Sequence, residues 1–425
     1  MNRLFSLLLL LITFPLLVQC QSSPESSSES EPDETLSLGI EQLLNEERHL
    51  VEGKRLGIIT NHSALLDGEH IVDLIHRDPD LEITALFGPE HGIRGTADAG
   101  EPVDHGVDEE TGIPVYSLYG EHRRPTPEML EDVDVLLFDI QDVGARYYTY
   151  VITMGRSMIS AAEAGIPFIV LDRPNPLGGE KIEGHIREDQ YQSGIGMYPT
   201  PITHGMTAGE LAQMILGEGW HEGLEGLELH VVAMEGWTRD MIWGDTGLEW
   251  VAPSPNLPDI ESTYVYPGTC LFEGTRASEG RGTYEPFIQV GSPFVDSEAV
   301  AAELNSRNLP GVRFQPVTFV PESIDGMSKE PKLLGEHVHG VKLEVLDANL
   351  MEPTAMGVHL LDAFYNELPN EEKENFFIER GIQIRTGNDH VHESIVAGTS
   401  MVEILDWQED VESFRTQREP YLIYP

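Results

Sequence analysis

The sequence predicts an α/β fold in which a Rossmann-like parallel sheet domain is followed by a smaller α+β domain, with a cleft at the interface. From Ile40 to about Trp250, short apolar runs alternate with stretches that carry apolar residues at helical spacing. Such alternation is typical of a largely parallel sheet joined by right-handed crossovers. Four of the apolar runs end directly in polar side chains, and ligands of parallel sheets bind at the carboxyl ends of strands. These strand ends favour an enzyme over a scaffold.

The first domain is predicted to span residues 37–258. Its strands are predicted at Leu56–Thr60, Ile83–Phe87, Val133–Phe138, Pro167–Leu171 and Leu227–Ala233. Its helices are predicted at Gln42–Val51, Glu69–Arg77, Pro127–Asp132, Tyr150–Ala164 and Thr207–Glu218. No G-x-G-x-x-G follows the first strand and the sequence has no Walker loop, so a nucleotide cofactor is unsupported.

The second domain is predicted to span residues 259–425, after the proline-rich stretch 253–258 that interrupts the alternation. Residues 266–284 read as a loop, because the stretch holds too much glycine and charge for a core. The predicted strands are Val312–Val320, Val338–Leu346 and Glu379–Arg385, and the predicted helices are Thr354–Asn366 and Val411–Arg418.

The N-terminus reads as a targeting segment. An apolar run from Leu4 to Val18 follows Arg3 and is shorter than the roughly 20 residues that a membrane-spanning helix needs. We interpret residues 1–19 as a signal peptide and Cys20 as a lipidation site, with a plain signal peptide cut nearby as the alternative. Residues 20–36, rich in Ser, Glu, Pro and Asp, form the predicted lipid-anchored disordered linker. This predicts a lipoprotein of the bacterial cell envelope that faces the periplasm or the cell exterior.

The charge of the chain is strongly negative, with 73 acidic against 26 basic residues and a formal net charge of −47. Such a surface suits high salt, because at 1 M ionic strength the Debye length falls to about 3 Å. It argues against nucleic acid as a partner, since the field repels phosphate. Cys270 lies in an apolar setting and is expected to be a buried structural thiol rather than a nucleophile.

Glu90 is the first candidate for catalysis. It lies between Gly88-Pro89 and His91-Gly92, on a rigid turn at a predicted strand end. Desolvation in a partly closed cleft raises the pKa of a carboxylic acid, which suits a general acid. The alternative is a glutamate that caps the turn or pairs with Arg94.

A second catalytic carboxylate is sought among Asp139, Asp142, Glu273 and Glu279. Asp139 and Asp142 follow an apolar strand, and the alternative for Asp139 is a cap of the helix that begins near Tyr148. Glu273 and Glu279 lie in the glycine-rich stretch with Arg276 and Arg281; that stretch either closes over the cleft or forms a surface ion-pair network.

Substrate binding is expected from side chains that follow the same strands. Arg146 is followed by tyrosines in the sequence, a combination that suits an anionic sugar. Arginine forms two parallel hydrogen bonds with a carboxylate, and aromatic rings stack on sugars. Packing alone is the alternative for the tyrosines. The candidate substrate-binding residues are Asn61, His62, His91, Arg94, Gln141, Arg146, Tyr148, Asp172, Arg173, Asn175 and Arg281.

Two H-x-H pairs, His337 with His339 and His390 with His392, would each place both rings on one strand face. Neither pair has a third ligand at a familiar spacing, and the chain has no H-E-x-x-H. No metal and no other cofactor are therefore expected.

Several long motifs resemble the exo-β-N-acetylmuramidases of the NamZ type. The resemblance runs from about Leu38 to Tyr424 and is carried by residues 60–62, 87–95, 138–150, 171–179, 254–258 and 273–283. It implies a cleft between the two domains and removal of N-acetylmuramic acid from non-reducing ends of peptidoglycan fragments. The family's proposed catalytic glutamate falls in Gly-Pro-Glu-His-Gly, hence on Glu90. The pair Arg276-Ala277 departs from the family, which more often has Asn followed by an apolar residue.

The resemblance leads to an exo-acting glycosidase that needs an acid and a second carboxylate across the sugar. Two other classes stay open at this point. A sugar-binding envelope lipoprotein without catalysis also fits two α/β domains behind a lipid anchor. A metal-dependent hydrolase would use the H-x-H pairs.

Overall fold

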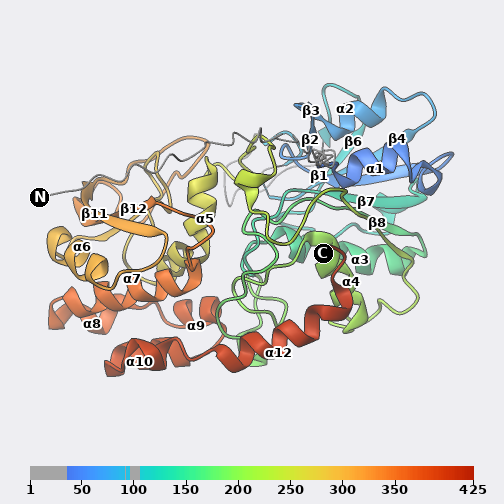
Figure 1. Cartoon of the computed structure of the whole chain (residues 1–425). Helices are drawn as coiled ribbons and strands as arrows, with labels where there is room; N and C mark the ends of the chain where they lie inside the picture. Colours follow the sequence, from blue (N-terminus) through green and yellow to red (C-terminus); the bar gives the residue numbers. More distant parts are fainter. Residues whose placement is uncertain (1–35, 91, 96–105) are drawn as a thin grey trace, which may run out of the picture. The chain divides into compact units, whose positions relative to one another are not determined.

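The computed structural model describes residues 36–90, 92–95 and 106–425, which belong to one compact unit (Figure 1). The predicted signal peptide, the lipidation site Cys20 and nearly all of the predicted linker lie outside the described residues, as does His91. Within the described ranges, no helix is both long enough and apolar enough to cross a membrane.

A seven-stranded sheet forms the first part of the described chain, in the order β5-β6-β4-β1-β7-β8-β9. All neighbours are parallel except β5 with β6. This confirms the predicted fold class. The strands are β1 (Arg55–Thr60), β4 (Glu82–Gly88), β5 (Gly106–Val107), β6 (Pro114–Ser117), β7 (Val135–Asp139), β8 (Phe168–Leu171) and β9 (Leu229–Val232), with a small hairpin of β2 (Leu65–Leu66) and β3 (Glu69–His70) beside them.

Helices cover both faces of this sheet, which makes it the centre of a three-layer sandwich. Alternate strand residues enter different cores: Leu137 packs into the core of α1 and α2, and Phe138 into that of α3 and α4. Both faces are therefore buried, which explains the nearly continuous apolar runs of the strands. The helices are α1 (Gly39–Asn45), α2 (Ile71–His76), α3 (Tyr150–Ala164) and α4 (Ala208–Gly217), with 3₁₀ turns η1 (Arg48–Leu50), η2 (Glu128–Leu130), η3 (Asp189–Tyr191) and η4 (Trp243–Asp245).

Local signals explain where these helices begin and end. Helix α3 has the predicted bounds, because Gly165 follows it in the left-handed conformation that stops a helix. Helix α4 begins at a capping box between Thr207 and Glu210. The predicted helix 127–132 forms only the short turn η2.

The strand order places a topological switch point at β1. From β1 the sheet grows through β4 to β6 on one side and through β7 to β9 on the other. Ile59 of β1 is paired with Phe87 of β4 and with Phe138 of β7, so the three strands end at the same level. Ligands of open α/β sheets bind in the crevice at such a point.

The second part is smaller and combines a three-stranded antiparallel sheet, in the order β10-β12-β11, with helices (Figure 1). This confirms the predicted α+β class. Its strands are β10 (Gln289–Ser292), β11 (Val312–Phe319) and β12 (Val338–Val345). Its helices are α5 (Ile260–Thr269), η5 (Cys270–Gly274), α6 (Ser297–Ser306), α7 (Pro353–Glu367), α8 (Asn370–Phe376), α9 (Gly381–Thr386), α10 (His390–Ala397), α11 (Met401–Ile404), α12 (Gln408–Arg418) and η6 (Glu419–Tyr421).

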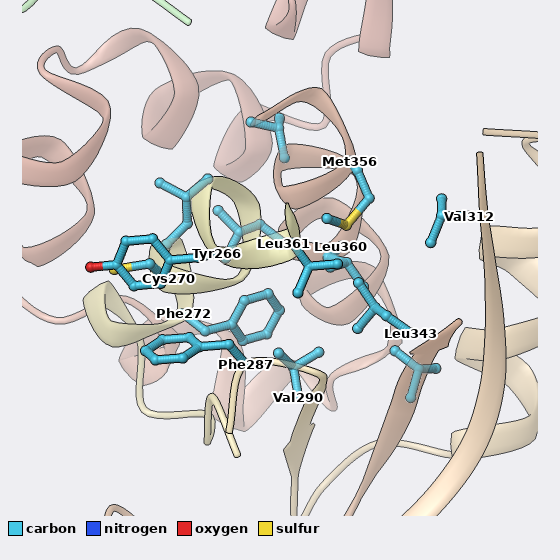
Figure 2. Packing of buried hydrophobic residues seen from close by; sticks show 14 of the residues in the cluster. Tyr266, Cys270, Phe272, Phe287, Val290, Val312, Leu343, Met356, Leu360 and Leu361 are labelled. Carbon is cyan, nitrogen blue, oxygen red and sulfur yellow. The ribbon is translucent and has the colours of Figure 1, made fainter. Parts of the chain in front are cut away.

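The prediction of a loop over 266–284 is wrong for its first half. Residues up to Gly274 belong to α5 and η5, and Tyr266, Cys270 and Phe272 lie in the core (Figure 2). Gly268 is required for packing, because a Cβ there would lie 2.2 Å from the carbonyl oxygen of Pro353 at the start of α7. Cys270 is buried, as predicted, and burial raises the pKa of its thiol.

The predicted strand Glu379–Arg385 is also wrong, since Gly381–Thr386 forms helix α9. Ile382 packs against Gly274 of η5, and this tertiary contact prevails over the short apolar alternation. His390 and His392 lie two residues apart in helix α10 rather than on a strand, so they do not share a face.

The end of the chain returns to the first part. Arg418 of α12 donates hydrogen bonds to the carbonyl oxygens of His204 and Gly205, at 2.9 and 2.6 Å. The Tyr424 hydroxyl donates to Asp172 at 2.6 Å. The last residues therefore pack on the parallel-sheet part, although the predicted second domain includes them.

Glu183 joins the two parts and makes stability depend on pH. Its buried carboxyl accepts a hydrogen bond of 3.0 Å from the Ala355 N–H at the start of α7, and burial raises its pKa to about 8. Because the folded pKa lies above the unfolded value of 4.5, the stabilisation is complete below pH 4.5 and is lost as pH rises towards 8.

We expect Glu183→Gln to remove this loss, because the amide keeps an acceptor for Ala355 N–H and never ionises. At pH 8 the variant should exceed the wild type by on the order of 2 to 4 kcal/mol in free energy of unfolding, and at pH 4.5 the two should be close. Urea unfolding at both pH values measures this. A constant difference between the two proteins would contradict the assignment.

Candidate active site

The candidate catalytic side chains follow three neighbouring strands at the switch point. Asn61 follows β1, Glu90 lies two residues after β4, and Asp142 lies three residues after β7. The turn that carries Glu90 is closed by a hydrogen bond of 3.0 Å from the Gly92 N–H to the Pro89 carbonyl oxygen. Gly92 has a φ of 72°, which favours glycine. The sheet thus brings together residues that are far apart in the sequence.

Tyrosines surround Glu90. The Tyr119 hydroxyl lies near Glu90, and burial, then the charge of Glu90, raise the pKa of that phenol. The half-buried Tyr148 and the buried Tyr150 pack edge to face, 4.9 Å apart between ring centroids, and feel the charges of Glu90 and Asp142. Tyr148 also meets Tyr266 of α5 at 5.9 Å. Residues of both parts of the chain therefore flank this site.

Asp142 is a candidate for the second carboxyl group. Its Oδ2 accepts a hydrogen bond of 2.8 Å from the Gly144 N–H, while its Oδ1 has no hydrogen-bond partner among the described residues. Burial raises its pKa to about 7. A carboxyl group poised near neutrality can exchange a proton during catalysis.

Other buried polar atoms near these carboxyls also lack partners in the described part of the chain. Gln141 donates to the carbonyl oxygens of Asp142 and Pro174, at 2.8 Å each, but its Oε1 accepts nothing. Asn256 donates to the Met327 carbonyl oxygen at 2.8 Å, and its Oδ1 is likewise unsatisfied. An unsatisfied buried polar atom costs about 1–3 kcal/mol, so such a group of atoms indicates a ligand site.

A cavity of about 340 Å³ adjoins the strand ends and is lined by Ser63, Gln141, Arg173 and Trp243. This volume lies within the range of small-ligand sites. Gln141 connects the cavity with Asp142, since it donates a hydrogen bond to the Asp142 carbonyl oxygen. Nowhere in the described ranges do three His, Cys, Asp or Glu side chains come together in a way that could hold a metal ion.

The other candidate carboxylates are engaged in ion pairs. Asp139 is completely buried against Arg173, and it does not cap α3, whose N-cap Thr149 has no side-chain cap. Glu273 binds Arg281 at 2.9 Å and Arg385 at 2.7 Å; although burial opposes it, these cations lower the pKa of Glu273. Glu279 binds Lys332 at 2.6 Å. The ion-pair network that the sequence left open is therefore present, and of the four candidates Asp142 is the one without an ion pair among the described residues.

The four arginines expected to hold substrate are held by the protein itself. The Arg94 guanidinium group forms ion pairs with both Asp73 and Asp108. Arg146 donates to backbone carbonyls, among them those of His185 at 2.9 Å and Arg385 at 2.7 Å. Arg173 pairs with Asp139, and Arg281 with Glu273. We therefore assign none of the four a contact with substrate.

Three further candidates support the fold. Asp172 accepts from Thr207 and Tyr424 at 2.6 Å each, and Asn175 bonds the backbone of Leu177 and Met206 at 3.0 Å each. His62 shares a hydrogen bond of 2.7 Å with the carbonyl oxygen of Ala252. The Tyr150 hydroxyl donates a hydrogen bond of 2.6 Å to the Pro253 carbonyl oxygen. These two contacts place the proline-rich stretch 253–258, which was predicted to cross between the domains, beside the site.

Tyr119 was missed as well. It follows β6, which is another strand of the parallel sheet, so the same signal of a polar side chain behind an apolar run could have found it. The run Pro114–Ser117 is short and mixed in character, and it was not predicted as a strand.

The fold and the site together fit a glycosidase: Glu90 and Asp142 lie behind the two strands that flank β1 in a parallel α/β sheet, and glycosidases use two carboxyl groups. The chain belongs to the exo-β-N-acetylmuramidase NamZ family: the model of the family's N-terminal part matches residues 56–261, and that of its C-terminal part matches residues 264–424. It is therefore a glycosidase, and the resemblance seen in its motifs is confirmed.

Known proteins agree with this assignment. The chain is 43% identical, over the full length of both proteins, to the peptidoglycan β-N-acetylmuramidase NamZ of Bacillus subtilis strain 168. Crystal structures of two DUF1343 family proteins from Bacteroides fragilis are similar to it, with TM-scores of 0.83 and 0.76 and identities of 36% and 34%. Each comparison covers 92% of this chain and 99% of the other.

Proposed function

We propose that this chain releases N-acetylmuramic acid from the non-reducing ends of peptidoglycan fragments, with Glu90 and Asp142 as its catalytic carboxyl groups. The observation that carries the proposal is their position at neighbouring strand ends of the switch point, among buried polar atoms without partners. The full-length relative named as a peptidoglycan β-N-acetylmuramidase supports the substrate.

Glu90 takes the role of proton donor to the glycosidic oxygen. It lies on a rigid turn, and the Tyr119 hydroxyl lies near its carboxyl group. Asp142 takes the role of the second group, which acts from the other side of the sugar. Burial poises its pKa near 7, so it can take up a proton near neutral pH, and its free Oδ1 offers the acceptor.

A chromogenic N-acetylmuramide tests this function. We expect the purified protein to release the chromophore equally with and without a chelator, and to release N-acetylmuramic acid from a disaccharide that carries it at the non-reducing end. Binding without turnover would favour the sugar-binding lipoprotein. Loss of turnover with chelator would favour the metal-dependent hydrolase.

The location of the protein is a separate proposal. The apolar run before Cys20 and the polar stretch after it support a lipoprotein of the bacterial cell envelope. Acyl chains contribute about 0.8 kcal/mol per buried CH₂ group to membrane binding, and the acidic chain offers no electrostatic substitute.

We therefore expect Cys20→Ser to move the protein from the membrane fraction to the soluble fraction. Fractionation at low and at high salt, followed by immunoblotting, measures the shift. Ser22→Ala, a substitution in the same polar stretch, is the control and should leave the protein in the membrane fraction. A Cys20→Ser variant that stays with the membrane would indicate a partner protein rather than a lipid anchor.

A further inference from the structure

Arg123, Arg156 and Arg276 differ from the other arginines that the structure describes. The side chains of the others are held by carboxylates or by backbone carbonyls, whereas these three have neither kind of partner within the described ranges. In a chain with 73 acidic residues against 26 basic ones, an arginine without a carboxylate is unexpected. Arg276 is exposed in the second part, whereas Arg123 and Arg156 lie near each other.

Helix α3 and the segment before η2 bring Arg123 and Arg156 together. Ser160, one turn after Arg156, donates a hydrogen bond of 2.7 Å to the Pro125 carbonyl oxygen. Glu163, one turn further, binds Arg124 at 2.8 Å. These two contacts fix the segment along the helix face that carries Arg156. Arg123 thereby comes close enough for its charge to act on Arg156, which is half-buried.

The surroundings of Arg156 hold no compensating carboxylate among the described residues. The groups that interact with it electrostatically are Arg123, the Tyr198 hydroxyl and the His221 ring. Tyr198 and His221 share a hydrogen bond of 2.9 Å, and Tyr198 stacks on Trp220 at 5.5 Å between ring centroids. Two like charges kept together beside aromatic rings are costly without an anion, and they suit a site that receives one.

The same segment connects this pair with the catalytic site. It begins at Tyr119, whose hydroxyl lies near Glu90 and feels the charges of Glu90 and of Arg123. Arg123 therefore lies on the Tyr119 side of Glu90, where an anionic group on a bound sugar can approach it. The pair also provides local positive charge in a chain whose net charge is −47 and would otherwise repel an anionic substrate.

We propose that Arg123 and Arg156 form the carboxylate-binding site of this enzyme and that they hold the lactyl carboxylate of the terminal N-acetylmuramic acid. The inference rests on the proposed function, because the lactyl group distinguishes this sugar from N-acetylglucosamine. Guanidinium groups bind carboxylates through paired, charge-assisted hydrogen bonds, which are about twice as strong as neutral ones. Carboxylates of an attached stem peptide have the same chemistry and are the other possible source of the anion.

The test compares Arg123→Gln and Arg156→Gln with Arg124→Gln. Arg124 is the matched control, because it is adjacent in the chain but paired with Glu163. Three chromogenic substrates are used: the N-acetylmuramide, its lactyl amide and the N-acetylglucosaminide. We expect kcat/KM on the muramide to fall roughly 10- to 100-fold in each test variant, with no change on the two uncharged substrates or in the control. Arg156→Lys should restore part of the loss.

Two results would overturn the inference: unchanged kcat/KM on the muramide, or an equal loss on all three substrates. A muramide whose lactyl group carries a peptide serves as a fourth substrate. A loss confined to it would assign the site to stem-peptide carboxylates and refute the lactyl assignment. If the wild type hydrolyses no muramide, the proposed function fails instead. Calorimetric binding of free N-acetylmuramic acid then tests the carboxylate-binding site by itself. Equal affinity in the wild type and in Arg156→Gln would refute the site. Melting temperatures exclude unfolded variants.

Discussion

Glu90→Gln is expected to lower the hydrolysis of an N-acetylmuramic acid disaccharide by roughly 10²- to 10⁴-fold, the usual contribution of general acid catalysis. The amide keeps the size of the side chain, but it cannot donate the proton that the leaving oxygen needs. Steady-state kinetics of the disaccharide, with release of the free sugar followed by chromatography, measures the change.

The control is Glu82→Gln, the same substitution at the exposed start of the strand that carries Glu90. It should leave turnover unchanged. Both variants should melt near the wild-type temperature, because neither side chain is buried. A Glu90→Gln variant within about threefold of the wild type would remove Glu90 from the mechanism.

Asp142→Asn is expected to have an effect of similar size on kcat, roughly 10²- to 10⁴-fold, since the amide cannot take up a proton. The amide oxygen of the asparagine can still accept the hydrogen bond from the Gly144 N–H, so the fold should persist. Because the pKa of Asp142 is raised to about 7, its stabilisation of the wild type is complete at acidic pH and declines as pH rises through 7. The free energy of unfolding of the variant should not show this decline with pH.

Asp139→Asn is the matched comparison on the same strand end. Asp139 and Arg173 form a buried ion pair, and removal of one partner of such a pair costs about 3–5 kcal/mol. We therefore expect Asp139→Asn to lower the free energy of unfolding, and Asp142→Asn to lower turnover without that loss. Urea unfolding and steady-state kinetics of both variants distinguish the structural role of Asp139 from the catalytic role of Asp142. An Asp142→Asn variant that keeps wild-type kcat would contradict the catalytic role.

The sheet could be predicted from the sequence because a strand that is buried on both faces is a continuous apolar run. β1, β4, β7 and β8 are such runs, and the polar residues behind them mark their carboxyl ends. Helix α3 was predictable to the residue because Gly165 ends it. These signals are local and need no knowledge of which segments meet in space.

The residues that failed prediction depend on distant partners. Gly268 suggested a loop, but its lack of a side chain serves the packing of α5 on α7, which lies about 85 residues further along the sequence. Arg173 looked free to bind substrate until the fold paired it with Asp139, and the partner of Arg385 is Glu273, 112 residues away. The sequence alone does not show which arginines have a carboxylate partner in the fold. It therefore could not distinguish Arg173 and Arg385 from Arg156, which has no carboxylate partner among the described residues.

The central claim, that Glu90 is the proton donor and Asp142 the second group, is tested most directly by the dependence of each variant on the leaving group. Activity of Glu90→Gln and Asp142→Asn is measured on a 2,4-dinitrophenyl muramide, which needs no protonation, and on the disaccharide, which does. The account predicts that Glu90→Gln loses less than about tenfold on the aryl glycoside and roughly 10²- to 10⁴-fold on the disaccharide, while Asp142→Asn is equally impaired on both. The reverse pattern, with Asp142→Asn selectively defective on the disaccharide, would contradict it.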